Sequence, residues 1–260
     1  LVGSEMCIRD SAMPRDGEWV VTGSKMFSTG AHECEFSFLL ARTNTEVPKH
    51  RGLTMFLVPL QQPAVTIRPI QTIGNERTNL VFYDEVLVDD RYRLGPVDDG
   101  WRVLSAPLDD EHGIGRADPD RLDEISGQGG WHNRSLQRML AAALTWARTK
   151  RPADGTRPID DPGVAGCLAE VAMDIEVVRN TPGAMGRVVA AELLIRDSAA
   201  LLELVAPEGL LLHGEDGAVQ DGIPEWAHRF AQGSAIYGGT VEIQRNIIAS
   251  RVLGLPRPLT

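Results

Sequence analysis

The sequence predicts an α+β fold, in which an antiparallel β-sheet or β-barrel is followed by a helical bundle. Strand-length runs of β-branched and aromatic residues fill residues 16–94, and Pro, Gly and polar residues separate them. Beyond residue 100, Ala, Leu, Glu and Arg recur at helical spacing. The change between these patterns, near Gly95 to Gly100, predicts a β-domain over 12–97 and a helical bundle over 98–260.

The first strands form a predicted hairpin in "DGEWVVTGSKMFSTG", residues 16–30. Its Asp-Gly pair is typical of a tight turn between antiparallel strands, and TGSK is expected to form a second turn. Four further strands are expected where apolar runs of strand length lie between polar links. They are "FSFLLART", "GLTMFLVPL", "VTIRPI" and "NLVFYDEVLV".

The helices of the second half are recognised by apolar residues that return every three or four positions. The clearest examples are "RMLAAALTWAR", "GCLAEVAMDIEVVRN" and "RVVAAELLIRDSAALLELV". Residues 1–11, "LVGSEMCIRDS", fit neither pattern, and we expect a foreign or disordered terminus there.

Composition excludes several classes of protein. The chain has 260 residues and a formal net charge of −10, with no cluster of Lys and Arg, so a nucleic-acid partner is not expected. Charged residues interrupt every apolar run before it reaches the length of a membrane span. Three widely spaced cysteines indicate neither a disulfide framework nor a metal site, and we expect a cytoplasmic protein.

The helix expected from Gly100 carries a candidate general base. Trp101, Leu104, Leu108 and Glu111 are spaced three, four and three residues apart, and therefore share one helical face. We expect this face to be buried. Burial without a partner would raise the pKa of the Glu111 carboxyl towards neutrality, as a general base requires, whereas pairing with an arginine would make it structural.

A second candidate site is the stretch "AIYGGTVEIQRN", residues 235–246. Gly238 and Gly239 permit positive φ angles and a close approach by another molecule, and Thr240 is a suitable N-cap for the helix that follows. Free backbone N–H groups at that helix start would suit a carbonyl oxygen or a phosphate. An ordinary tight loop is the alternative.

The stretch "HECE" could indicate a metal site. Strand alternation would place His32 and Cys34 on one face, but a buried cysteine beside a hydrogen-bonded histidine explains the pattern without a metal. No metal site is predicted.

Two longer stretches resemble the acyl-CoA dehydrogenase family. "IYGGTVEIQRNIIASRVLGLP" is similar to that family's C-terminal signature. "GEWVVTGSKMFSTGAHECEFSFLLART" with "VFYDEVLVDDRYRLGPVDDGWRVL" resembles its middle β-domain and the start of its bundle. The resemblance implies FAD as cofactor and dehydrogenation of an acyl-CoA thioester at its α and β carbons. It also implies that the family's N-terminal helical domain is missing and that the chain is a fragment.

The resemblance assigns roles to individual residues. Those implied to contact FAD are Phe27, Ser28, Thr29, Thr240, Val241 and Glu242. Tyr237 and Gly239 match residues that line the thioester end of the substrate pocket. Gly238 stands where many members carry the catalytic glutamate, and leaves room for a bulky or branched acyl group.

A subset of the family carries its base elsewhere, in a pattern like LDxER on the first long helix of the bundle. Residues 108–112 match this pattern, and they place Glu111 at the base. Asp109 and His112 match positions near the substrate's pantetheine, where His112 replaces the usual arginine. Helical spacing and family resemblance thus select the same glutamate.

The resemblance also implies partners and leaves other functions open. An electron-transfer flavoprotein or a similar acceptor, and a homo- or hetero-oligomer (dimer or tetramer), are expected. The Arg-x-x-Phe-Gly motif that reaches FAD across the subunit interface has no clear counterpart in "ARTKRPADGTRPIDD". A non-catalytic structural subunit therefore remains an alternative, as does a related acyl-CoA oxidase or flavin monooxygenase.

Overall fold

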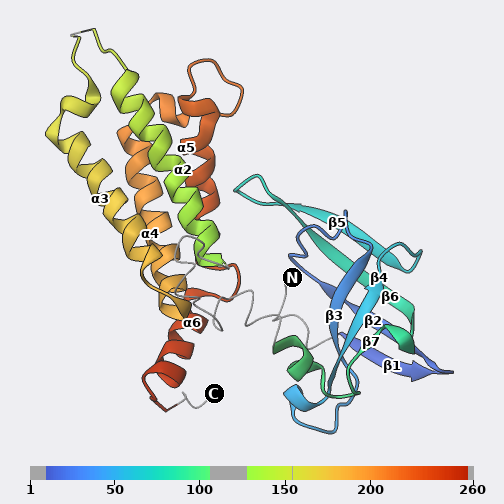
Figure 1. Ribbon diagram of the computed structural model, residues 1–260. Coiled ribbons are helices and arrows are strands. Elements are labelled where there is room, and N and C mark those ends of the chain that lie inside the picture. Colours follow the sequence, from blue (N-terminus) through green and yellow to red (C-terminus); the bar gives the residue numbers. More distant parts are fainter. Residues whose placement is uncertain (1–9, 106–127, 154, 257–260) are drawn as a thin grey trace. The chain divides into compact units, whose positions relative to one another are not determined.

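The computed structural model describes residues 10–105, 128–153 and 155–256, and the side chains of 128–131 are not described (Figure 1). The chain forms two units, which are described separately. The described residues of the sheet unit are 10–72 and 76–105, and those of the helical unit are 73–75, 128–153 and 155–256.

In the described part of the sheet unit, seven strands form one sheet in the order β5-β6-β2-β1-β3-β4-β7. All neighbours pair antiparallel except β1 and β3, which share one parallel register position. The four strands predicted after residue 35 and the run after the Asp-Gly pair are therefore confirmed, whereas β1 and the short β7 were not predicted. Their bounds are β1 Ser11–Arg15, β2 Glu18–Lys25, β3 Phe36–Arg42, β4 Leu53–Pro59, β5 Val65–Gln71, β6 Arg77–Asp89 and β7 Arg93–Leu94.

The predicted Asp-Gly turn is confirmed, but the hairpin predicted around TGSK is wrong, and the run after TGSK forms a turn and no strand. Asp16 and Gly17, with φ angles of 52° and 88°, connect β1 to β2 as expected of an Asp-Gly turn. TGSK lies inside β2, because pairing with β6 continues through this segment after a register shift between Val21 and Gly23. Ser11 already belongs to β1, while residues 1–9, where a foreign terminus is expected, lie outside the described residues.

Alternating side chains of the strands form the core of the sheet unit. Trp19 on β2 and Phe56 on β4 meet there, with 5.3 Å between their ring centroids. A smaller cluster joins Leu40, Met55 and Leu104. Leu104 belongs to the helix that begins at Gly100, so the described start of this helix packs on the sheet.

The face predicted for this helix is confirmed only in part. Leu104 is buried as expected, but Trp101 is 47% exposed. The predicted face of this helix is therefore buried at Leu104 but not at Trp101 within the sheet unit. Leu108 and Glu111, the other members of that face, lie outside the described residues.

Gly100 allows the helix to begin directly against β4. A Cβ at this position would lie 2.7 Å from both the Met55 nitrogen and the Thr54 carbonyl carbon. Gly100→Ala is therefore expected to lower the free energy of unfolding by about 1–3 kcal/mol, because backbone atoms must move to admit the methyl group. Calorimetric unfolding of the parent and the variant would measure the loss.

Gly166 provides the matched control for Gly100→Ala. It lies in a helix, and a Cβ there would meet nothing within 4 Å. Gly166→Ala is expected to stabilise by about 0.5–1 kcal/mol through helix propensity. Equal effects of the two substitutions would contradict close packing at Gly100.

The helical unit contains the helices predicted from apolar spacing. Their bounds in the described residues are α2 Gln128–Thr149, α3 Pro162–Arg179, α4 Gly183–Leu204, α5 Ile223–Ala231 and α6 Val241–Ile247. A π-helical segment, Ile248–Val252, continues α6. Short 3-10 turns lie between helices at Pro158–Asp160, Glu208–Leu210 and Val219–Gly222. The described residues of the sheet unit include two more, Lys49–Arg51 and Asp90–Tyr92.

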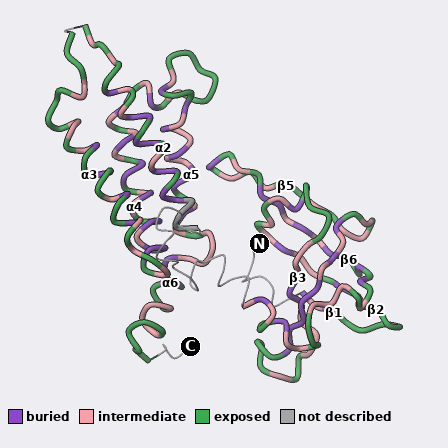
Figure 2. The backbone as a smooth tube through the Cα atoms, viewed as in Figure 1, coloured by how far each residue is buried: buried purple, intermediate pink, exposed green. Residues whose placement is uncertain are grey.

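Helix α4 packs against α2, α3, α5 and α6. Figure 2 shows buried backbone running along α2 and α4, with exposed backbone at the loops between helices. Met139, Leu194, Leu201 and Ala231 are fully buried in this core. None of the helices in the described residues is long and apolar enough to cross a membrane.

Candidate functional site

The segment after β2 presents an aromatic ring on a constrained turn. Phe27 has a φ angle of 61°, which is uncommon for a residue with a bulky side chain, and 51% of its surface is exposed. The Thr29 amide donates to the Phe27 carbonyl at 3.0 Å, and the Thr29 hydroxyl donates to Thr78 Oγ1 at 3.2 Å. Phe27, Ser28 and Thr29 therefore form an ordered turn with an exposed ring.

A buried asparagine on β6 holds this turn. Asn79 is fully buried, and its carbonyl accepts from the Ser28 amide at 2.8 Å. Its Nδ2 donates to the Ser28 carbonyl at 2.9 Å and lies 3.2 Å from His32 Nδ1. The sequence did not single out Asn79, because one polar residue in "RTNLVF" is also typical of the solvated face of a strand.

The interpretation of "HECE" needs a correction. His32 has a hydrogen-bond partner, as expected, but Cys34 is exposed. Residues 31–33 form a turn, so the alternation of side chains in a strand does not apply to them. Among the described residues, no three His, Cys, Asp or Glu side chains come close enough to hold a metal ion.

Asn79→Ala is expected to release the turn. Removing the side chain leaves the partly buried Ser28 carbonyl without this donor, and the lost hydrogen bond costs about 0.5–1.5 kcal/mol of folding free energy. Amide hydrogen exchange at residues 27–32 should become faster. Gln71→Ala, at the exposed end of β5, is the control and should change neither quantity. Unchanged protection of the turn in Asn79→Ala would show that other contacts hold it.

The second candidate segment, before α6, adopts the backbone that its glycines allow. Gly238 and Gly239 have φ angles of 59° and 84°, which confirms the expected positive φ at both positions. A Cβ on Gly239 would lie 3.1 Å from Nε2 of the buried Gln244. That Nε2 also donates to the Gly238 carbonyl at 3.3 Å.

Thr240 is the N-cap of α6 as expected, since its Oγ1 accepts from the Ile243 amide at 3.4 Å. The expectation of free N–H groups at this helix start is wrong for Val241, whose amide donates to the Ala235 carbonyl at 3.0 Å. Hydrogen bonds from the Thr240 hydroxyl and from its own amide hold the pKa of Glu242 below its ordinary value. The amides of Val241 and Ile243 thus already donate to oxygens of this chain.

Tyr237 folds back over the preceding turn. A Cβ on Gly233 would lie 2.3 Å from the Tyr237 hydroxyl oxygen, so the glycine makes room for the ring. The ring lies 6.3 Å from that of Phe230, which stacks on Trp226 at 5.2 Å. Tyr237 therefore rests on an aromatic row of α5.

The helical unit also holds two buried basic side chains that the sequence did not single out. His132 on α2 and Arg187 on α4 are 2% and 3% exposed. Burial, and then the charge of Arg187, lowers the pKa of His132 from 6.5 to about 3. Burial also lowers the pKa of Arg187 from its ordinary value to about 10, so Arg187 stays protonated at neutral pH. The sequence signal was a lone arginine at the start of the apolar run "RVVAAELL".

The predicted site residues fall in both units. Phe27, Ser28 and Thr29 share one turn of the sheet unit, and residues 237–242 share one turn of the helical unit. The candidate base Glu111, with Asp109 and His112, lies outside the described residues.

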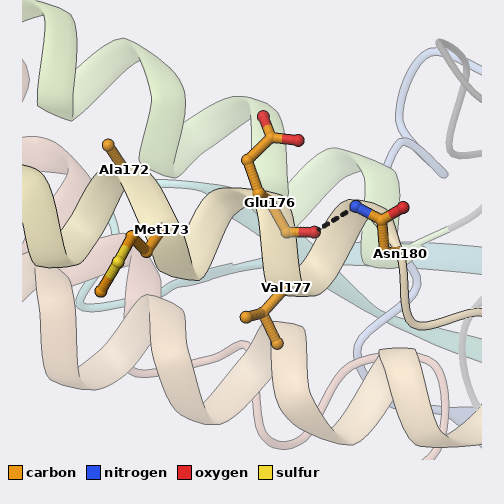
Figure 3. A pocket seen from close by; sticks show the side chains of 5 residues that line it. All are labelled: Ala172, Met173, Glu176, Val177 and Asn180. Atoms are coloured by element: carbon orange, nitrogen blue, oxygen red, sulfur yellow. Dashed lines mark hydrogen bonds between the residues drawn. The ribbon is translucent and has the colours of Figure 1, made fainter.

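A shallow hollow on the surface of α3 contains none of the predicted site residues (Figure 3). Met173 and Val177, 64% and 48% exposed, form its apolar part. Asn180 Nδ2 donates to the Glu176 carbonyl at 2.8 Å at one end. Its polar groups are satisfied within one helix, and we assign no chemistry to it.

Comparison with protein families matches two successive domain models. Residues 2–86 match the acyl-CoA dehydrogenase middle domain, and residues 131–253 match the acyl-CoA dehydrogenase C-terminal domain. Acyl-CoA dehydrogenase IpdE1 of Mycobacterium tuberculosis is 33% identical over 98% of this chain. The chain spans 64% of the length of that relative.

Solved structures show the same fold. The ChsE4-ChsE5 complex from Mycobacterium tuberculosis contains a chain with a TM-score of 0.83 and 26% identity, covering 98% of this chain and 68% of that one. A structure described as the Tcur3481-Tcur3483 steroid ACAD has a TM-score of 0.82 and 25% identity, covering 96% of this chain and 64% of that one.

Proposed function

Because this chain belongs to the acyl-CoA dehydrogenase family, we propose that its protein oxidises an acyl-CoA thioester to the α,β-unsaturated product, using FAD. The family is FAD-dependent in general. The observation that carries the proposal is the ordered Phe27–Thr29 turn, whose exposed aromatic ring is held from below by the buried Asn79. The resemblance to the family implies that these three residues contact the flavin ring.

The sheet unit fits a flavin better than the start of α6 does. Phe27 offers an exposed aromatic face, and Ser28 and Thr29 offer polar groups beside it. The α6 start offers side chains rather than free amides, because the Val241 and Ile243 amides are already bonded within the chain. Phe27, Ser28 and Thr29 would therefore form the principal contact of this chain with the ring, and Thr240, Val241 and Glu242 a secondary one.

When bound, FAD supplies the acceptor for the hydride that leaves the β carbon. The remaining task for the protein is to remove the α proton, which we assign to the Glu111 carboxylate. Tyr237 and the two glycines after it would line the thioester end, and Asp109 and His112 the pantetheine. Gly238 stands where many family members carry the catalytic glutamate, so we assign the role of base to Glu111.

The substrate class that we propose is a bulky or branched acyl group, and a steroid-derived one in particular. Gly238 and Gly239 place no side chain at the turn that would face the acyl group. The structural relative described as a steroid ACAD, at 25% identity, supports this choice.

The partners that we propose are an electron-transfer flavoprotein or a similar acceptor and a second subunit. A chain of the ChsE4-ChsE5 complex, 26% identical to this one, supports a hetero-oligomer. The lack of a clear counterpart to the cross-interface FAD motif agrees with a hetero-oligomer, in which the two subunits contribute unequally to the cofactor site.

An absorbance spectrum of the full-length protein tests the proposal, alone and with its partner subunit. Oxidised flavin bands that bleach on anaerobic addition of a steroid-side-chain acyl-CoA would support it. Bands that persist with steroid, branched and straight-chain acyl-CoAs would refute it. If flavin binds only when the partner is present, and the partner's site carries all turnover, this chain is a non-catalytic subunit. Hydrogen peroxide formed during turnover would indicate an oxidase.

A further inference from the structure

Arg187 lies beneath the turn that the proposed function places at the thioester. Its Nη2 donates to the Ser234 carbonyl at 2.7 Å and also to the Tyr237 carbonyl. These acceptors lie 47 and 50 residues further along the chain. One guanidinium from α4 therefore holds both sides of a single turn.

Among the described residues, the charge of Arg187 has no carboxylate counterpart. Within the described part of the chain, no carboxylate forms an ion pair with it, and its Nε and Nη1 have no hydrogen-bond partner. A buried charge without a partner lowers stability, and a well-packed apolar side chain of similar size often replaces one without loss. Stability alone therefore does not explain an arginine here.

The bonds of Arg187 determine how a peptide unit is oriented. In a planar trans peptide, the C=O and the following N–H point in opposite directions. Because the Tyr237 carbonyl points to Arg187, the Gly238 N–H points away from it. That N–H has no partner among the hydrogen bonds of the described residues, so it remains available as a donor.

Two other contacts hold the same turn without replacing Arg187. Ser234 Oγ donates to the Ala191 carbonyl of α4 at 3.2 Å, and Gln244 Nε2 donates to the Gly238 carbonyl at 3.3 Å. Neither reaches the Tyr237 carbonyl. Among the side-chain contacts that the described residues make with this turn, the one from Arg187 reaches the Tyr237 carbonyl.

We infer that Arg187 is a positioning residue, which aims the Gly238 N–H at the substrate by holding the Tyr237 carbonyl. This inference rests on the proposed function for the identity of the substrate. A donor aimed at the thioester oxygen acts on the charge that develops as the α proton leaves, so it affects turnover more than binding. Arg187 itself acts through the backbone and does not touch the substrate.

The test compares Arg187→Met and Arg187→Lys with Arg179→Met, in the full-length protein with its partner subunit. Arg179 is an exposed arginine on α3 that pairs with Glu176 of its own helix, and it serves as the matched control. Arg187→Met is expected to lower kcat by about 10- to 100-fold, with KM within about 3-fold of the parent, because a small misplacement of a group at the reacting centre slows chemistry. Arg187→Lys should restore part of kcat, since an ammonium can donate to one of the two carbonyls.

Hydrogen exchange gives a readout that needs no turnover. In Arg187→Met, exchange at residues 233–240 should become faster, while the amides of α2 and the core of α4 keep their protection. The positioning role would be overturned if hydrogen exchange at residues 233–240 were no faster in Arg187→Met than in Arg179→Met. A loss of protection throughout the helical unit would also overturn it. If acyl-CoA bleaches the flavin of the parent protein, an unchanged kcat in Arg187→Met would also overturn the positioning role.

The two proposals fail in different ways. A parent protein that holds flavin but is bleached by no acyl-CoA refutes the proposed function. Exchange at the turn still decides whether Arg187 holds the peptide. As a further check, guanidinium added to Arg187→Ala should restore protection of the turn, whereas sodium chloride at equal ionic strength should not.

Discussion

Glu111→Gln is expected to leave the flavin spectrum of the resting protein intact and to slow its bleaching by acyl-CoA by about 10²- to 10⁴-fold, the usual contribution of a general base. Glutamine keeps the size and polarity of the side chain but cannot accept the α proton. Anaerobic stopped-flow absorbance of the full-length protein would measure the reduction rate directly, without the later transfer of electrons to a partner.

Asp110→Asn is the matched control for Glu111→Gln. It removes one carboxylate from the adjacent position, which helical spacing places on a different face. We expect its reduction rate to stay close to that of the parent. Equal rates for the parent and Glu111→Gln would remove Glu111 from the role of base.

Acidification is expected to destabilise the helical unit through His132. Burial, with a contribution from Arg187, lowers the pKa of this side chain from 6.5 to about 3 in the folded protein. As the pH falls below 6.5, the unfolded chain takes up a proton at this position that the folded chain does not. The resulting loss of stability is about 1.4 kcal/mol per pH unit, and about 2 kcal/mol between pH 7 and pH 5.

His132→Gln should remove this part of the pH dependence, because glutamine does not titrate. Urea unfolding at pH 7 and pH 5 would give the difference in slope between parent and variant. His50→Gln is the control, since His50 is exposed, and its slope should follow the parent. Equal slopes for the parent and His132→Gln would show that His132 is solvated or paired in the folded protein.

The sequence predicted the elements that depend on local signals. Asp16 and Gly17 form the expected turn, Thr240 caps the expected helix, and the glycines before it have the expected positive φ. Turn chemistry, capping and apolar spacing involve residues within a few positions of one another. A single sequence therefore contains the information needed to recognise them.

Two predictions were wrong because the residues concerned form hydrogen bonds with a distant strand or with an earlier backbone group. TGSK reads as a turn, yet β6 pairs with it and keeps it in β2. The helix start at Val241 reads as a set of free donors, yet the Ala235 carbonyl, six positions earlier, accepts from the first of them. Trp101 follows the spacing of a buried face but is exposed in the described unit.

By itself, the sequence determined most of the strands, the main helices, the two candidate turns and, through resemblance, the family. Only the tertiary structure decided which buried side chains hold those turns. Asn79 bonds to a turn 51 residues earlier, and Arg187 bonds to one 47 residues later. The physical reason is that a buried polar group must find its partner wherever packing brings one, and packing joins residues whose separation in sequence carries no local pattern.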